Sequence, residues 1–154
     1  MDPTKVKGVQ EWKTPRNLKD IRSFIGFLNF CRRYVRGFSH IAAPLNRLIA
    51  HTAKGNKFHW GKEEDEAFRS LIKAVTSAPV LRQPNFEEQF VVDTDDSKHA
   101  IGAVLQQHDE KGHLRPVAYL SKTLDQQQRN WDVYDRELYA VVEALKVWRR
   151  YYCI

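Results

Sequence analysis

The fold prediction for this chain rests on residues 90–120, FVVDTDDSKHAIGAVLQQHDEKGHLRPVAYL. Three runs in it have strand length and are rich in β-branched and apolar side chains: residues 90–95, 101–107 and 114–120. The polar run 108–112 ends in Gly112, which favours a turn between the second and third strands. Because the connections are short, the strands are predicted to form an antiparallel meander.

Helical periodicity precedes this stretch, since apolar residues recur there at steps of three and four. The pattern predicts three helices, over residues 17–37, 41–49 and 62–76. Asn17 is the predicted N-cap of the first helix and Gly37 its predicted stop. Residues 1–16 are predicted to be a polar lead-in, and residues 51–57 a linker.

A last helix is predicted from Asp132 onward. Its apolar residues follow helical steps and define the face predicted to be buried: Tyr134, Leu138, Val141, Leu145 and Trp148. Glu137 flanks this stripe, whereas Glu143 is predicted to point to the opposite, solvated side. Strands and helices together predict a mixed α+β fold.

Length and composition restrict the possible functions. The 154 residues allow one ordinary domain or two small pieces, and no apolar run approaches the roughly 20 residues of a membrane helix. Cys31 and Cys153 have no spacing typical of a disulfide framework or a zinc site. We therefore expect an intracellular protein, cytoplasmic or nuclear and not secreted, with neither a membrane nor a small-molecule partner.

The charge is unevenly distributed along the chain. Residues 1–60 carry 12 Lys and Arg against 3 Asp and Glu, whereas residues 61–154 carry 13 against 16. Five polar residues lie within about 100° of one another on a wheel of the first long helix, opposite its apolar stripe: Lys19, Arg22, Asn29, Arg33 and Arg36. This arrangement suits a phosphate backbone, and a solvated face of an ordinary amphipathic helix is the equally weighted alternative.

Two acidic positions are candidates for chemistry. Asp93 and Asp95 share one face of the first strand, where the alternative is that both simply meet water at the following turn. Glu137 lies at the edge of the apolar face of the last helix, where the alternative is a local ion pair with Arg136. If that helix packs on the meander, Asp95 and Glu137 could converge on one Mg²⁺, which prefers carboxylate oxygens and substrate phosphates.

Long motifs in this order resemble the reverse transcriptase polyprotein of gypsy-type LTR retrotransposons. They cover nearly the whole chain: IRSFIGFLNFCRRYVRGFSHIAAPLNRLI, FHW with EAF, APVL, FVVDTDDSKHAIGAVLQQ, RPVAYLSKTL and RNWDVYDRELYAVVEALKVWRRY. The resemblance implies a thumb-like helical segment over residues 1–57 and an incomplete ribonuclease H-like unit over residues 58–154. It also implies an RNA–DNA hybrid or a template–primer duplex as partner, together with the remainder of the polyprotein.

The resemblance also implies roles for the two acids. The family's first catalytic aspartate lies in a Thr-Asp-Ala-Ser motif, which here reads Thr94-Asp95-Asp96-Ser97, and its catalytic glutamate corresponds to Glu137 in Arg136-Glu137-Leu138. Asp95 and Glu137 would thus be catalytic residues and ligands of Mg²⁺. Asp96 replaces the usual Ala.

Other departures concern what the sequence lacks. It ends before the family's fourth strand and its later metal ligand, and it has no Tyr-x-Asp-Asp motif. The chain alone is therefore expected to have neither polymerase nor ribonuclease H activity. Residues 90–95 are expected to form an exposed strand edge. The alternative is a non-catalytic, nucleic-acid-binding or structural remnant of a decayed element.

Overall fold

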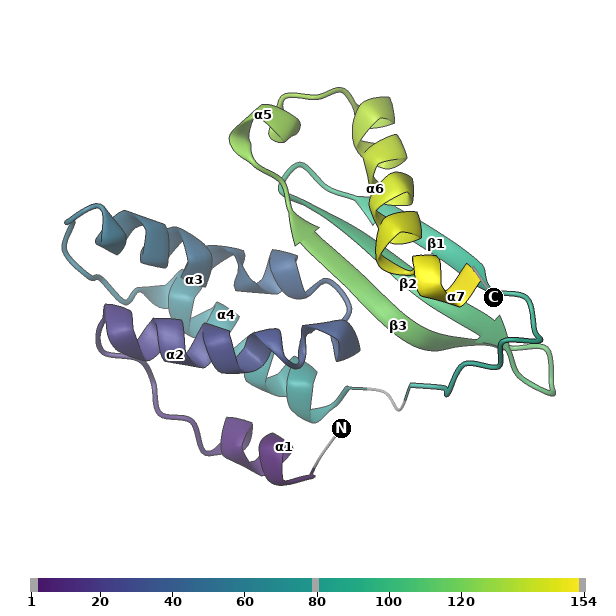
Figure 1. Cartoon of the computed structure of the whole chain (residues 1–154). Helices are drawn as coiled ribbons and strands as arrows, with labels where there is room; N and C mark the ends of the chain where they lie inside the picture. The colour runs from purple at the N-terminus through teal and green to yellow at the C-terminus, as the bar shows by residue number, and fades with distance from the viewer. Residues whose placement is uncertain (1–2, 79–80, 153–154) are drawn as a thin grey trace. The chain divides into compact units, whose positions relative to one another are not determined.

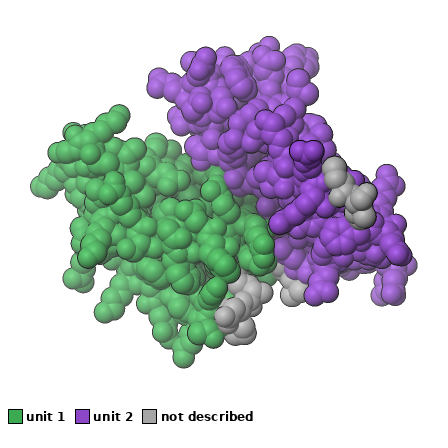
Figure 2. Space-filling view, in the orientation of Figure 1, with its two compact units in different colours: residues 1–79 green, residues 80–154 purple. Residues whose placement is uncertain are grey.

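The computed structural model describes residues 3–78 and 81–152. Its contacts divide the chain into two compact units, Met1–Pro79 and Val80–Ile154, called unit 1 and unit 2 below (Figure 2). Unit 1 is helical and unit 2 combines a sheet with helices (Figure 1). The mixed α+β class predicted from the sequence is confirmed.

Unit 1 contains four α-helices and one 3-10 turn in its described residues: α1 Pro3–Gln10, α2 Leu18–Asn29, η1 Arg32–Tyr34, α3 Phe38–Ala53 and α4 Lys62–Thr76. Asn17 caps α2 as predicted, because its side chain accepts a hydrogen bond from the backbone nitrogen of Asp20 at 2.9 Å. Helix α4 has the predicted bounds, and acidic residues fill its first turn, where the helix dipole favours them.

The predicted end of the first long helix is wrong. Helix α2 ends at Asn29, the chain tightens into η1, and Val35 is extended. Gly37 has a left-handed conformation with φ of 66°, and it precedes α3 instead of ending α2. Helix α3 is longer at both ends than the predicted helix over residues 41–49.

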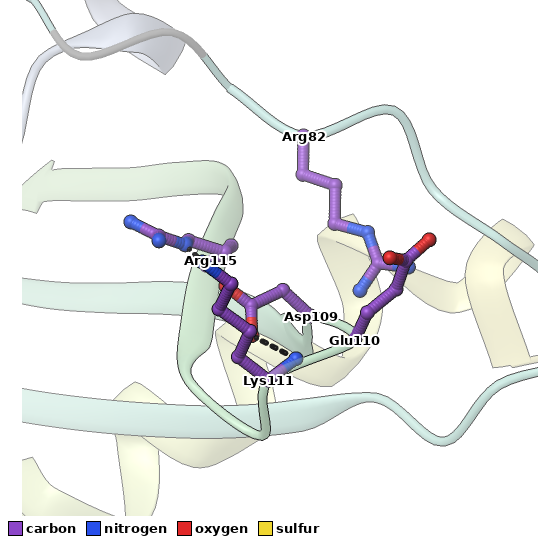
Figure 3. A pocket seen from close by; sticks show the side chains of 5 residues that line it. All are labelled: Arg82, Asp109, Glu110, Lys111 and Arg115. Carbon is purple, nitrogen blue, oxygen red and sulfur yellow. Dashed lines mark hydrogen bonds and ion pairs between the residues drawn. The ribbon is translucent and has the colours of Figure 1, made fainter.

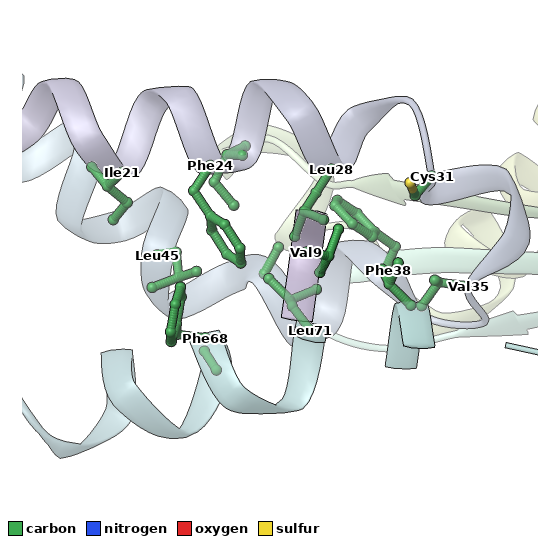
Figure 4. Packing of buried hydrophobic residues seen from close by; sticks show 14 of the residues in the cluster. Val9, Ile21, Phe24, Leu28, Cys31, Val35, Phe38, Leu45, Phe68 and Leu71 are labelled. Carbon is green, nitrogen blue, oxygen red and sulfur yellow. The ribbon is translucent and has the colours of Figure 1, made fainter. Parts of the chain in front are cut away.

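The core of unit 1 joins all four helices (Figure 4). Its largest fully buried side chains include Phe24 and Leu28 of α2, Leu45 of α3 and Leu71 of α4. Val9 of α1 is also fully buried, so the lead-in predicted for residues 1–16 contributes to the core. Helix α4, on the C-terminal side of the boundary predicted at 57/58, packs into this same core.

Unit 2 is built on an antiparallel sheet with the order β1-β2-β3. Its elements are β1 Val91–Asp96, β2 Ala100–His108, β3 Leu114–Thr123, α5 Gln126–Arg129, α6 Val133–Val147 and α7 Arg149–Tyr152. Helix α6 lies along one face of the sheet (Figure 1). The predicted meander is therefore confirmed, and β1 is an edge strand within the described part of the chain.

The buried face predicted for the last helix is right at Trp148 but wrong at its other four positions, Tyr134, Leu138, Val141 and Leu145, which are exposed. Ala140, Ala144 and Trp148 are buried, whereas Tyr134 is 79% exposed and Leu138 is 62% exposed. Ala144 and Trp148 pack with β2 and β3 in the core of unit 2, where small alanine side chains let a helix lie close to a sheet. Most of the large apolar side chains of this helix are therefore exposed.

The prediction that Glu143 points to the solvated side of the helix is also wrong. Its side chain is only 13% exposed, and its carboxylate accepts a hydrogen bond from Nζ of Lys122 on β3 at 2.7 Å. The hydrogen bond from Lys122 lowers the pKa of Glu143. Glu143 thus ties α6 to the sheet instead of pointing into solvent.

A buried glutamine fixes the segment that leads into β1. The side-chain oxygen of Gln107 accepts from the backbone nitrogen of Asn85 at 2.9 Å, and its nitrogen donates to the carbonyl of Asn85 at 2.7 Å. Gln107 is fully buried, so these bonds satisfy an amide that would otherwise be costly to bury.

Within the residues described, no helix is both long and apolar enough to cross a bilayer.

Candidate functional site

The end of β1 and the first turns of α6 form an open depression of about 420 Å³. Its lining comes from both elements: Thr94, Asp95, Asp96, Tyr134, Glu137, Leu138, Ala140 and Val141. Asp95 and Glu137, 42 positions apart in the sequence, thus line the same depression, and both are exposed. Asp93 does not line it.

A tight turn sets the position of Asp95. Asp95 pairs with Gly102 in the β1–β2 register, one position before the strand ends. The following turn is closed by Ser97, whose backbone nitrogen donates to the carbonyl of Ala100 at 2.9 Å and whose hydroxyl oxygen accepts from the nitrogen of Ala100 at 3.1 Å. The serine of the motif therefore closes the hairpin that presents Asp95.

An N-cap sets the position of Glu137. The Asp132 side chain accepts a hydrogen bond from the backbone nitrogen of Asp135 at 2.9 Å, which starts α6 at Val133. Glu137 follows in the second turn and lines the depression together with Tyr134 and Leu138. These two apolar neighbours of Glu137 are exposed.

The residues next to these two acids form an ion pair. Nε of Arg136 donates to Oδ2 of Asp96 at 2.9 Å, and both side chains are largely buried, 14% and 13% exposed. A second nitrogen of Arg136 donates to the carbonyl of Trp131 at 2.8 Å. This pair was not predicted from the sequence. The signal for it was Asp96, which replaces the usual Ala of the motif, together with Arg136, which precedes Glu137.

The side chains of the depression supply only some of the ligands that a hard cation needs. Carboxylate oxygens are the ligands that Mg²⁺ prefers, and two of them are present and accessible. In the part of the chain that the structure describes, no group of three or more histidines, cysteines or acids could hold a metal ion. Asp95 and Glu137 could therefore hold a divalent ion only together with oxygen ligands from water, phosphate or other residues.

The predicted basic face is arranged differently from the helical wheel. Lys19, Arg22 and Asn29 lie on α2, but Arg33 lies in η1 and Arg36 in the turn before α3. The single helix assumed for the wheel is therefore wrong, because α2 ends at Asn29. All five side chains are nevertheless exposed.

An aromatic contact holds one of these cations. The guanidinium of Arg33 lies 4.9 Å from the ring centre of Tyr34 and donates to its hydroxyl at 2.6 Å. Arg33 is thereby restrained at the surface of unit 1, and Arg22 lies on the exposed side of α2. Such a surface can contact a polyanion through several separate cations.

A second depression, at the β2–β3 turn, has paired charges (Figure 3). Asp109 accepts hydrogen bonds from Nε of Arg115 at 2.8 Å and from the backbone nitrogens of Lys111 and His113 at 2.9 Å each. These bonds, that from Arg115 first, lower the pKa of Asp109 to about 2. Arg82 donates to the carbonyl of His108 and forms an ion pair with Glu88. It thereby connects the β2–β3 turn to the segment before β1.

Comparisons with known proteins agree with this architecture. Residues 60–153 match the family described as the RNase H-like domain found in reverse transcriptase. The transposon Tf2-3 and Tf2-4 polyproteins of Schizosaccharomyces pombe are each 34% identical to the chain over 143 residues, which are 93% of the chain and 10% of each polyprotein. The chain therefore spans about a tenth of the length of these curated relatives.

Solved structures show the same fold. A foamy viral protease–reverse transcriptase in complex with double-stranded DNA has a TM-score of 0.84 and 27% identity, over 99% of this chain and 26% of that one. The foamy viral enzyme in complex with an RNA/DNA hybrid has a TM-score of 0.80 and 27% identity, over 97% of this chain and 20% of that one. Since the family match covers more than half of the residues, this chain belongs to the RNase H-like domain family of reverse transcriptases and corresponds to a reverse transcriptase segment of a retrotransposon polyprotein.

Proposed function

We propose that this chain serves two tasks of a retrotransposon reverse transcriptase: it holds a nucleic-acid duplex and it contributes carboxylates to the ribonuclease H site. Residues 1–57 would be the thumb-like part and residues 58–154 the ribonuclease H-like part. The observation that carries the proposal is that Asp95 and Glu137, far apart in sequence, line one open depression. The remainder of the polyprotein would be the natural partner.

Asp95 and Glu137 would be the residues that hold Mg²⁺. When bound, such an ion activates water and neutralises the charge that builds on the leaving oxygen of a phosphodiester. The chain's own contribution is to present two hard oxygen ligands from a strand end and a helix, next to apolar Leu138 and Val141. Exposed carboxylates in an open depression leave room for a backbone phosphate of the substrate.

Two carboxylates are too few for a complete two-metal site. We therefore expect the isolated chain not to cleave the RNA strand of an RNA–DNA hybrid in the presence of Mg²⁺. A gel assay with a labelled hybrid checks this expectation. Cleavage that depends on Mg²⁺ and is lost in Asp95→Asn would show instead that the chain is competent alone.

Duplex binding would depend on the exposed residues Lys19, Arg22, Asn29, Arg33 and Arg36. Two kinds of observation support it: the exposed cations of unit 1, and the DNA and hybrid complexes of the related foamy viral enzymes. Each contact between a cation and a phosphate releases counterions, so affinity should fall steeply with salt.

The test is the salt dependence of hybrid affinity, measured by fluorescence anisotropy. The double substitution Arg22→Ala/Arg33→Ala should flatten the log–log slope by about 0.9 per lost contact. The matched control is Lys62→Ala/Lys73→Ala, which removes two exposed cations from α4 in the same unit. No measurable affinity, or an equal change of slope in both double variants, would contradict the proposed interface.

A further inference from the structure

The contact that joins β1 to the start of α6 involves the immediate neighbours of the two candidate ligands. Asp96 follows Asp95, and Arg136 precedes Glu137. Their side chains meet at 2.9 Å. The contact thus links the two backbone segments that carry Asp95 and Glu137.

Arg136 is fixed at more than one point. Besides Asp96 it bonds to the carbonyl of Trp131, in the segment just before α6. The ring of Trp131 in turn packs edge-on against Tyr139 of α6, with ring centres 5.5 Å apart. Arg136 therefore ties the strand end, the helix and the segment that leads into the helix together.

Burial makes this pair different from a surface ion pair. Exposed pairs contribute little because solvent screens them and their side chains lose entropy on pairing. Both partners here are largely buried, so the loss of one leaves the other as a poorly solvated charge that must find a new position.

We propose that Asp96 and Arg136 are positioning residues that hold Asp95 and Glu137 at one divalent-cation position. This inference rests on the proposed function, because it requires that Asp95 and Glu137 bind a metal ion. Arg136 also neutralises Asp96, which keeps a third carboxylate of the depression engaged and away from the ion. The role is a feature of this chain, since the motif that it resembles has Ala in place of Asp96.

A second ion pair between α6 and the sheet provides the matched control. Lys122 of β3 contacts Glu143 of α6 at 2.7 Å, and neither residue lines the depression. Loss of this pair should weaken the packing of α6 without moving Asp95 relative to Glu137. A purely structural role for Asp96 and Arg136 would make the two pairs equivalent.

The test uses the full chain and Mn²⁺ alone, with free Mn²⁺ measured by electron paramagnetic resonance. We expect Asp96→Ala and Arg136→Ala each to raise the Kd for Mn²⁺ about tenfold, as loss of a group that orients a metal ligand does. Arg136→Lys, which keeps the charge, should recover part of the affinity. Lys122→Met should lower stability to urea but leave the Kd unchanged.

The outcomes separate this inference from the proposed function. If the unsubstituted chain binds Mn²⁺, Asp95→Asn abolishes binding and Asp96→Ala leaves the Kd unchanged, the positioning role is wrong while the metal site stands. If Lys122→Met raises the Kd as much as Asp96→Ala does, the effect is general destabilisation and the inference is also wrong. If the unsubstituted chain binds no Mn²⁺, or Asp95→Asn binds it equally well, the proposed metal site fails and the inference fails with it.

Discussion

Helices α2 and α6 both carry an apolar stripe, but they use it in opposite ways. In α2 the stripe is buried: Phe24 and Leu28 are fully enclosed by other helices of unit 1. In α6 the stripe through Leu138 and Leu145 is exposed, and the helix packs on the sheet through Ala140, Ala144 and its C-cap Trp148. The same sequence pattern therefore leads to a core in one unit and to an uncovered surface in the other.

The difference shows what an apolar periodicity does and does not predict. It identifies a face that gains free energy when it leaves water. Whether the face is buried depends on the partners that the chain provides. Unit 1 surrounds α2 with other helices, whereas in the described part of unit 2 the sheet covers the alanine face of α6 and leaves Leu138 and Leu145 exposed.

The largest expected contrast comes from truncating one large side chain in each helix. Phe24→Ala should destabilise unit 1 by about 3–5 kcal/mol, because it leaves a cavity in a packed core. Leu138→Ala on α6 should change stability by less than about 0.5 kcal/mol, because this side chain is already mostly exposed. Both changes in stability are measured by urea unfolding, followed through the amide NMR signals of each unit. Equal losses would contradict the different burial of Phe24 and Leu138.

A smaller effect is expected from enlarging the buried face of α6. Ala144→Leu should cost about 1–3 kcal/mol, since the added carbons have no space between the helix and the sheet. The neighbouring substitution Leu145→Ala serves as the control and should be nearly neutral. If Leu145→Ala were the more harmful of the two in urea unfolding, α6 would pack through the stripe predicted from the sequence.

The exposed stripe should influence association more than stability. Uncovered apolar surface beside an edge strand such as β1 favours self-association. We expect the double substitution Leu138→Lys/Leu145→Lys to reduce the weight-average mass in sedimentation at high protein concentration, with little change in urea stability. A chain that is monomeric without these substitutions would contradict this expectation.

The smallest effect concerns the pH dependence of the β2–β3 turn. The pKa of Asp109 is lowered to about 2 from an ordinary value of 3.8, so its contribution to stability is present above pH 3.8 and is lost as the pH falls toward 2. Asp109→Asn should therefore remove part of the acid sensitivity of unit 2 in that interval. The measurement is the urea midpoint between pH 2 and pH 5, with Glu110→Gln on the same turn as the control. An unchanged pH profile in Asp109→Asn would be inconsistent with the hydrogen bonds at this carboxylate.

Local signals in the sequence were sufficient for much of the fold. The cap at Asn17, the acidic first turn of α4 and the turn at Gly112 act within a few residues, and the structure has each of them where it was predicted. The end of α2 and the role of Gly37 were missed, because apolar spacing continues through η1 although the backbone is no longer α-helical.

The site was predictable to a different degree. Asp95 and Glu137, which were singled out from the sequence, line one depression. Their roles as metal ligands stay a prediction. The Asp96–Arg136 pair and the Lys122–Glu143 pair could not be derived from periodicity, because both depend on which face of α6 meets the sheet. That choice is made by close packing of alanines, which carry a weak signal on any hydrophobicity scale.

Whether Asp95 and Glu137 hold one divalent cation can be measured by paramagnetic broadening in NMR spectra of the isotope-labelled full chain during titration with Mn²⁺. If they share the ion, amide signals at the end of β1 and in the first turns of α6 should broaden together, and Asp95→Asn and Glu137→Gln should each remove the broadening from both elements. Broadening confined to one element, or broadening that persists in both variants, would contradict a shared ion.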